Sequence, residues 1–294
     1  MAPARPRPID DKPTPDPTTS HPKGRPMATP QAALLIDMDG VLYQGERPIP
    51  GAAETLRWID AQQIPHLFVT NTTSRPRAAL VDKLARFGIT TGAEHILTPP
   101  VAATRRLAGR IEGPAALFVP EATRAEFQGI ATVDPESAAD DTSVGAVIIG
   151  DYGAHWSYAA LNRAFRWLMQ AQAPPLIALG MTRYWQADDG LRLDTAPFVV
   201  ALSHAIGREP VVLGKPARPF FDAALSQLGA GAAQTAMIGD DIRGDVQGAQ
   251  AAGLRGLLVR TGKFRPEDLD GDIRPDAVLG SIAELPDWWG GQPA

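Results

Sequence analysis

The segment ALLIDMDGV, residues 33–41, joins a short apolar run to two aspartates and a glycine. A run of this length that ends in polar residues predicts a buried strand leading into a loop. Asp37 and Asp39 would then leave the carboxyl end of the strand, where open α/β sheets bind their ligands. Gly40 lets the chain turn sharply, so both carboxylates can face one small volume. By itself the segment leaves an acidic site and a solvated acidic turn equally open.

Strand and helix patterns alternate on both sides of this segment. Such alternation predicts an α/β protein, with a Rossmann-like, doubly wound parallel sheet covered by helices on both faces. The expected strands after the first are residues 66–70, 234–238 and 256–259, and the expected helices are residues 51–62, 76–87 and 245–252.

The middle of the chain repeats the alternation on its own, with expected strands at 115–119, 145–149 and 176–179 and expected helices at 121–128 and 157–172. A segment with its own strands and helices predicts an inserted α/β cap domain, which we place at residues 101–207. The core would then consist of residues 31–100 and 208–288. Residues 1–30 hold nine prolines and few apolar side chains, so we expect a disordered N-terminal tail there.

Polar residues follow two further expected strands. Thr70 and Asn71 close the strand at 66–70, and their hydroxyl and amide could donate hydrogen bonds to phosphate oxygens. Lys215 follows the expected strand at 210–213 and stands between Gly214 and Pro216, which would hold its charge in place for a phosphate or for carboxylates. Taken alone, each is more often a helix cap or a surface residue at a turn.

The segment GDDIRGD, residues 239–245, is a second acidic cluster behind an apolar strand. Mg²⁺ prefers oxygen ligands and takes one or two protein carboxylates together with water and phosphate. Asp240 fits such a ligand, and Asp241 and Asp245 could orient the ion and its waters. The alternative is an acidic helix start without metal, because carboxylates also favour helix N-termini.

The bulk composition excludes several other classes of function. The formal net charge is −5, so the chain lacks the basic surplus of a protein that binds nucleic acid. It has no cysteine, which excludes disulfides and thiolate zinc sites and agrees with a reducing cytoplasm. The longest apolar runs are too short to cross a membrane, and no signal peptide opens the chain. We therefore expect a cytoplasmic protein without a membrane partner.

The four polar segments, in this order, resemble the motifs of the haloacid-dehalogenase-like hydrolases that carry a large α/β cap. Three stretches narrow the resemblance: GMTRYWQADDGLRLDTAPF at 180–198, GDDIRGDVQGA at 239–249 and VRTGKFRP at 259–266. They are similar to the phospholysine phosphohistidine inorganic pyrophosphate phosphatases and their relatives. One departure is Asp39, since the animal phospholysine-type enzymes have serine at this position.

The resemblance implies a Mg²⁺-dependent phosphatase with an aspartyl-phosphate intermediate on Asp37. Asp39 would act as general acid and base, and its presence makes an ordinary phosphomonoesterase plausible. The metal would be held by Asp37, the backbone carbonyl of Asp39 and Asp240. Thr70, Asn71 and Lys215 would bind phosphate.

The expected partner is a small phosphorylated molecule: a phosphomonoester, a phosphoamino acid or pyrophosphate. A 4-nitrophenylphosphatase-like enzyme and a phosphoglycolate or nucleotide phosphatase are alternatives, and a non-catalytic interaction module is a weaker one. Caps of this kind often form dimers, so the resemblance also allows a homodimer through the cap.

Overall fold

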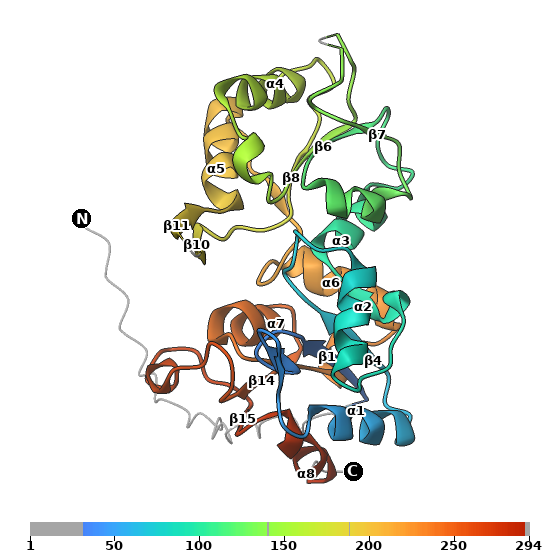
Figure 1. Ribbon diagram of the computed structural model, residues 1–294, viewed down its shortest axis with the longest axis vertical. Coiled ribbons are helices and arrows are strands. Elements are labelled where there is room, and N and C mark those ends of the chain that lie inside the picture. The colour runs from blue at the N-terminus through green and yellow to red at the C-terminus, as the bar shows by residue number, and fades with distance from the viewer. Residues whose placement is uncertain (1–31, 140, 188, 292–294) are drawn as a thin grey trace, which may run out of the picture.

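The computed structural model describes residues 32–139, 141–187 and 189–291. The predicted tail, residues 1–30, lies outside the described residues. Two α/β bodies follow one another along the long axis of the molecule, and the described C-terminal end lies in the lower one (Figure 1). In the part of the chain that is described, no helix combines the length and the apolarity needed to span a bilayer.

The lower body, the core, is built on a six-stranded sheet in which every pairing is parallel. From β1 the order runs through β4 to β5 on one side and through β13 and β14 to β15 on the other. The order therefore reverses next to β1, which creates a ligand crevice outside the carboxyl ends of the strands. The strands are β1 Ala33–Asp37, β4 His66–Val69, β5 Ile96–Leu97, β13 Thr235–Gly239, β14 Arg255–Val259 and β15 Ala277–Leu279.

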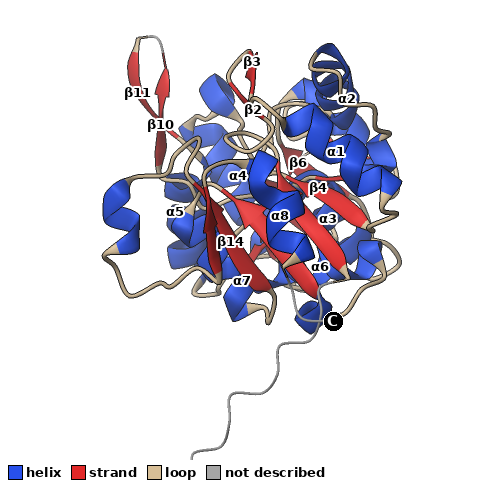
Figure 2. Ribbon diagram, turned by 90° about the horizontal axis from the view of Figure 1, so that it is seen from below, coloured by secondary structure: helices blue, strands red, loops and turns tan. Residues whose placement is uncertain are grey.

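Alternation along β1 buries side chains on both faces of the core sheet. Leu34 and Ile36 pack with residues of α1, α2 and α8 on one face, while Leu35 packs with α3 and α6 on the other. Helices flank the strands in Figure 2 accordingly. Each fully buried Leu or Ile contributes roughly 1.5–3 kcal/mol, so these faces hold the strand ends in place. The helices are α1 Ala52–Ala61, α2 Arg77–Arg86, α3 Pro99–Leu107, α6 Arg218–Leu228, α7 Gly248–Ala251 and α8 Leu285–Gly290.

The upper body, the cap, has its own parallel sheet of order β12-β9-β8-β6-β7. One face of this sheet packs on α4 and α5, and the other joins the apolar cluster that contains α3 and α6. The predicted α/β fold with an inserted second sheet is therefore confirmed. The cap elements are β6 Ala115–Phe118, β7 Thr132–Val133, β8 Ala146–Ile149, α4 Tyr158–Leu168, β9 Leu176–Ala178, α5 Thr195–Ile206 and β12 Val211–Val212.

Two elements cross the expected domain limits. β12 pairs with β9 through Val211 and Val212, so the chain leaves the cap sheet a few residues after the expected limit at 207/208. α3 begins at Pro99, before the expected limit at 100/101, and packs against both α6 of the core and the 3₁₀ segment Glu121–Phe127 of the cap. The sequence signalled an α-helix at 121–128, but the structure has this 3₁₀ segment instead. One apolar cluster thus runs continuously from core to cap.

Candidate active site

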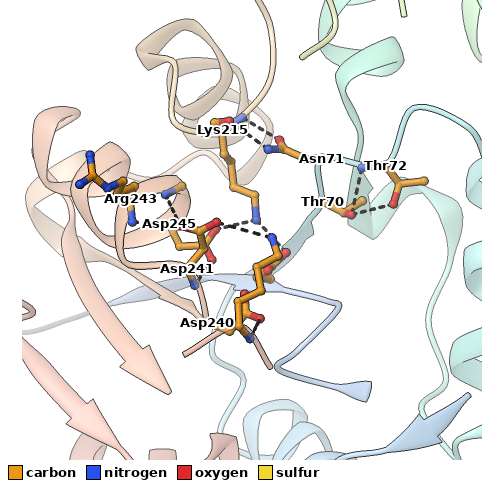
Figure 3. A network of polar contacts seen from close by, with 11 residues as sticks. Thr70, Asn71, Thr72, Lys215, Asp240, Asp241, Arg243 and Asp245 are labelled. Atoms are coloured by element: carbon orange, nitrogen blue, oxygen red, sulfur yellow. Dashed lines mark hydrogen bonds and ion pairs between the residues drawn. The ribbon is translucent and has the colours of Figure 1, made fainter. Parts of the chain in front are cut away.

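A pocket of about 360 Å³ opens at the carboxyl ends of β1, β4 and β13. It brings together the side chains that the sequence singled out from four separate segments, drawn in part in Figure 3. Parallel strands end on the same edge of a sheet, which is why residues more than 200 positions apart meet here. The pocket is lined by Asp37, Asp39, Gln44, Thr70, Asn71, Thr72, Lys215, Asp240, Asp241, Gly244, Asp245, Gly262 and Lys263.

Lys215 joins two of the carboxylates in a buried ion-pair triad. Its Nζ lies 2.7 Å from Oδ1 of Asp37 and 2.6 Å from Oδ1 of Asp245, and its side chain is only 4% exposed. Burial opposes the charged form of Lys215, but Asp245 and Asp37 outweigh it and raise the lysine pKa. Burial raises the pKa of Asp37, and Lys215 opposes that shift. The nucleophile candidate is therefore held beside a fixed positive charge.

Asn71 holds the backbone of Lys215 in place. The backbone N–H of Lys215 donates to Oδ1 of Asn71 at 2.7 Å, and Nδ2 of Asn71 donates to the carbonyl of Lys215 at 2.9 Å. Both ends of the amide thus contact the same residue across 144 positions of sequence. The buried Thr70 hydroxyl donates to Oγ1 of Thr72, which also faces the pocket. The contacts of Asn71 point to a role in positioning the lysine.

The acidic loop after β13 differs from the expected helix at 245–252. A π-helical turn spans Ile242–Gln247 and leads into α7, and Asp241 caps it by accepting from the N–H groups of Arg243 and Gly244 at 3.0 and 2.8 Å. Aspartate is a preferred residue at this capping position. The helix therefore begins three residues earlier than expected. As a result, Asp245 lies inside the turn, buried against Lys215, and not at the start of the helix.

Asp240 is buried, and only one of its two carboxylate oxygens has a hydrogen-bond partner among the described residues. Its Oδ2 accepts the backbone N–H of Lys263 at 2.7 Å, but its Oδ1 has no hydrogen-bond partner among the described residues. Burial raises the pKa of Asp240 to about 6, and burial likewise raises the pKa of Asp245 to about 6. Carboxylate oxygens of Asp37, Asp240 and Asp245 all lie within 4.8 Å of one another. A buried oxygen without a partner beside two more carboxylates fits a divalent cation such as Mg²⁺.

Five lining residues were not predicted as site residues from the sequence: Gln44, Thr72, Gly244, Gly262 and Lys263. Gln44 comes from the short hairpin of β2 Tyr43–Gln44 and β3 Arg47–Pro48. Gly262 and Lys263 follow β14, and a strand end at this edge was the signal that could have revealed them. The Thr261 hydroxyl donates to the carbonyl of Gly40, which ties the loop after β14 to the loop that carries Asp39.

Gly262 is required where these two loops meet. It has φ of +65°, and a Cβ atom there would collide with Oδ2 of Asp240 and approach Cα of Gly40 to 2.6 Å.

We expect Gly262→Ala to destabilise the protein by about 2–4 kcal/mol, since overpacking adds to the cost of positive φ. Gly207 is the matched control, with φ of +64° and no atom within 4 Å of the added methyl. Gly207→Ala should cost about 1 kcal/mol. Melting temperatures of both variants check this, and equal losses would contradict the close approach at Gly262.

A haloacid dehalogenase-like hydrolase model matches residues 34–130, and a HAD-hydrolase-like model matches residues 212–285. The fold and the site define a capped hydrolase whose polar groups sit at the strand ends of an α/β core. The chain belongs to the haloacid dehalogenase-like hydrolases.

Individual relatives cover nearly the whole described chain. The phospholysine phosphohistidine inorganic pyrophosphate phosphatase of Homo sapiens is 38% identical over 259 residues, which are 86% of this chain and 92% of that protein. The haloacid dehalogenase-like hydrolase domain-containing protein 2 of Bos taurus is 40% identical over 255 residues, or 86% and 93% of the two chains. The structure of the p-nitrophenyl phosphatase from Archaeoglobus fulgidus superposes with a TM-score of 0.77 at 28% identity, covering 88% of this chain and all of that one. The relatives named for a reaction are thus phosphatases.

Proposed function

We propose that this hydrolase is a Mg²⁺-dependent phosphatase that acts through an aspartyl-phosphate on Asp37. The observation that carries the proposal is the convergence of Asp37, Asp240 and Asp245 around Lys215 at the base of an open pocket. A lysine paired with two buried carboxylates, with a third carboxylate beside them, is costly to assemble, because burial penalises every one of these charges. A cation and a phosphate would complete the charge balance of such a site. The phosphatase names of the relatives support the same reaction.

Asp37, Asp240 and the backbone carbonyl of Asp39 would hold the metal, with Asp245 beside them. When bound, Mg²⁺ supplies positive charge that neutralises phosphate oxygens and the neighbouring carboxylates. The donor set consists of oxygen atoms, which suits this ion better than softer metals. The Oδ1 of Asp240 has no hydrogen-bond partner among the described residues, which supports its proposed role as a metal ligand.

In the first step, a carboxylate oxygen of Asp37 attacks phosphorus, and the bond between phosphorus and the leaving oxygen breaks. In the second step, water attacks the aspartyl-phosphate, releases inorganic phosphate and restores Asp37. This divides one difficult displacement into two easier ones. Lys215, held 2.7 Å from Asp37, stabilises charge on the phosphoryl oxygens, and the Thr70 hydroxyl, which lines the pocket, would turn from Thr72 to donate to them.

Asp39 supplies and removes the proton. Its side chain is exposed and lines the pocket, in contrast to the buried Asp37 two residues earlier. Asp39 would protonate the leaving oxygen in the first step and take a proton from water in the second, a role worth roughly 10²–10⁴-fold in rate. The same residue disfavours a purely non-catalytic module, since binding alone has no need of a proton donor here.

The substrate is proposed to be a small phosphorylated molecule, because the pocket at the strand ends of the core has a volume of only about 360 Å³. Phosphomonoesters, phosphoamino acids and pyrophosphate fit this size, as the names of the relatives suggest. A homodimer through the cap and a cytoplasmic location stay predictions from the sequence.

The proposed function is tested by comparing how much rate Asp39→Asn loses on substrates with good and with poor leaving groups. The unaltered enzyme should hydrolyse 4-nitrophenyl phosphate and ethyl phosphate with Mg²⁺ and neither after chelation of the metal. Asp39→Asn should lose on the order of 10²–10⁴-fold on the ethyl ester and far less on the aryl ester, because 4-nitrophenolate leaves without a proton. Equal losses on both esters would remove Asp39 as the acid, and no turnover of either by the unaltered enzyme would overturn the proposed function.

A further inference from the structure

Lys263 is a second cation in the pocket that the proposed reaction does not use. It follows β14, and its backbone N–H donates to Oδ2 of Asp240 at 2.7 Å. Its side chain is 71% exposed, and its Nζ lies 3.5 Å from Oδ2 of Asp241, which is beyond ordinary hydrogen-bond distance. The backbone of this residue therefore contacts the acidic cluster, and its ammonium group lies beside Asp241 in the pocket, where it is accessible to solvent.

The two lysines of the pocket differ in what they can still bind. Lys215 is 4% exposed and makes contacts of 2.7 and 2.6 Å with two carboxylates, so its charge is largely matched within the protein. Among the residues that the structure describes, Lys263 has one ion-pair partner, at 3.5 Å, and its side chain is largely exposed to solvent. An ammonium has three donors, so the contact with Asp241 leaves Lys263 capacity for a bound anion.

Contacts of the loop place Lys263 near the proposed proton donor. The Thr261 hydroxyl donates to the carbonyl of Gly40, and Gly262 closely approaches Cα of the same glycine. Gly40 directly follows Asp39, which would protonate the leaving oxygen. Lys263 and Asp39 both line the pocket, so a leaving group protonated by Asp39 would share the pocket with the lysine.

We propose that Lys263 binds an anionic group on the leaving portion of the substrate, which makes short, doubly anionic phosphates the favoured substrates. This inference rests on the proposed phosphatase function. Five aspartates and two lysines line the pocket, so a second negative charge on the substrate needs a positive partner there. The class includes pyrophosphate, whose second group is a phosphate, and phosphorylated carboxylic acids, whose second group is a carboxylate.

The test compares three substrates across four forms of the full-length protein. Pyrophosphate, phosphoglycolate and ethyl phosphate carry a phosphate, a carboxylate and no second anion, respectively. Lys263→Gln keeps the backbone N–H to Asp240 and removes only the ammonium, and Lys263→Arg restores a charge. Arg260→Gln is the matched control, because it removes one exposed positive charge from the same loop without lining the pocket.

For Lys263→Gln we expect kcat/KM to fall about tenfold or more on whichever anionic substrate the enzyme uses, mainly through KM. On ethyl phosphate the same variant should lose less than about twofold. Lys263→Arg should recover most of the loss, and Arg260→Gln should lose nothing. A larger loss on pyrophosphate than on phosphoglycolate identifies phosphate as the second group, and the reverse identifies carboxylate.

Two results would overturn the role of Lys263 while leaving the phosphatase function intact. One is an equal loss on all three substrates, which would mean that the side chain acts only through Asp241 and the acidic cluster. The other is unchanged kinetics on both anionic substrates. If the unaltered enzyme turned over no phosphate at all, the proposed function itself would fail. Equilibrium binding of pyrophosphate to the unaltered protein and to Lys263→Gln would then still decide the inference, because equal affinities contradict it.

Discussion

Asp37→Asn is expected to lower turnover on the order of 10⁴-fold or more, the largest effect of any single replacement in this protein. The amide has nearly the size of the carboxylate but is a far poorer nucleophile, so the first bond to phosphorus would not form. Lys215 would still pair with Asp245, 2.6 Å away, so the fold should survive the change. The measurement is the hydrolysis rate of 4-nitrophenyl phosphate, with the folded state checked by circular dichroism and melting temperature.

A covalent readout distinguishes a lost nucleophile from a merely distorted site. Rapid acid quenching of the unaltered enzyme during turnover should trap a phosphorylated peptide that contains Asp37, and the variant should trap none. Asp82→Asn is a suitable control, because Asp82 is exposed on α2 and does not line the pocket. It should keep full activity. A folded Asp37→Asn protein with appreciable turnover would disprove the covalent mechanism.

Sequence patterns predicted the sheet and the residues at its edge because both depend on local chemistry. Apolar runs of four to five residues end in Asp37, Thr70 and Asp240, and strands in a parallel sheet expose such ends on one edge. The pairing of Lys215 with both Asp37 and Asp245 follows once those ends meet. The segments that carry the chemistry were therefore readable from the chain alone.

Other parts of the site depend on contacts across long stretches of sequence. Asn71 was expected to bind phosphate, yet both ends of its amide contact the backbone of Lys215, 144 positions away. Nothing local to Asn71 signals that pairing. Asp245 was expected at a helix start, but capping by Asp241 begins the helix earlier and turns Asp245 into the cluster. In the sequence, Lys263 resembles an ordinary surface lysine. Its place in the pocket depends on the loop after β14, which is held against Gly40 by the hydrogen bond from Thr261.

Asp240→Asn is expected to produce the next largest effect, and to act on the metal. Its Oδ1 is buried and has no hydrogen-bond partner in the described part of the chain, and its Oδ2 accepts the N–H of Lys263, so the carboxylate is fixed and ready to bind an ion. The amide keeps the shape but removes a negative charge from the proposed ligands. We expect the Mg²⁺ concentration for half-maximal rate to rise by about 100-fold or more, or activity to vanish.

The relative effects of three substitutions on Mg²⁺ binding distinguish the carboxylates that bind the metal from those that hold these ligands in place. Asp241→Asn should have the smallest effect, because asparagine caps a helix about as well as aspartate. Asp245→Asn should be intermediate, at about 10–100-fold, since Asp245 also neutralises Lys215. Binding can be read without turnover from the rise in melting temperature that saturating Mg²⁺ gives each variant, because a ligand that binds only the folded state stabilises it. That rise should disappear in Asp240→Asn and persist in Asp241→Asn. If the rise in melting temperature were lost more completely in Asp245→Asn than in Asp240→Asn, Asp245 would be the principal carboxylate ligand and Asp240 would support it.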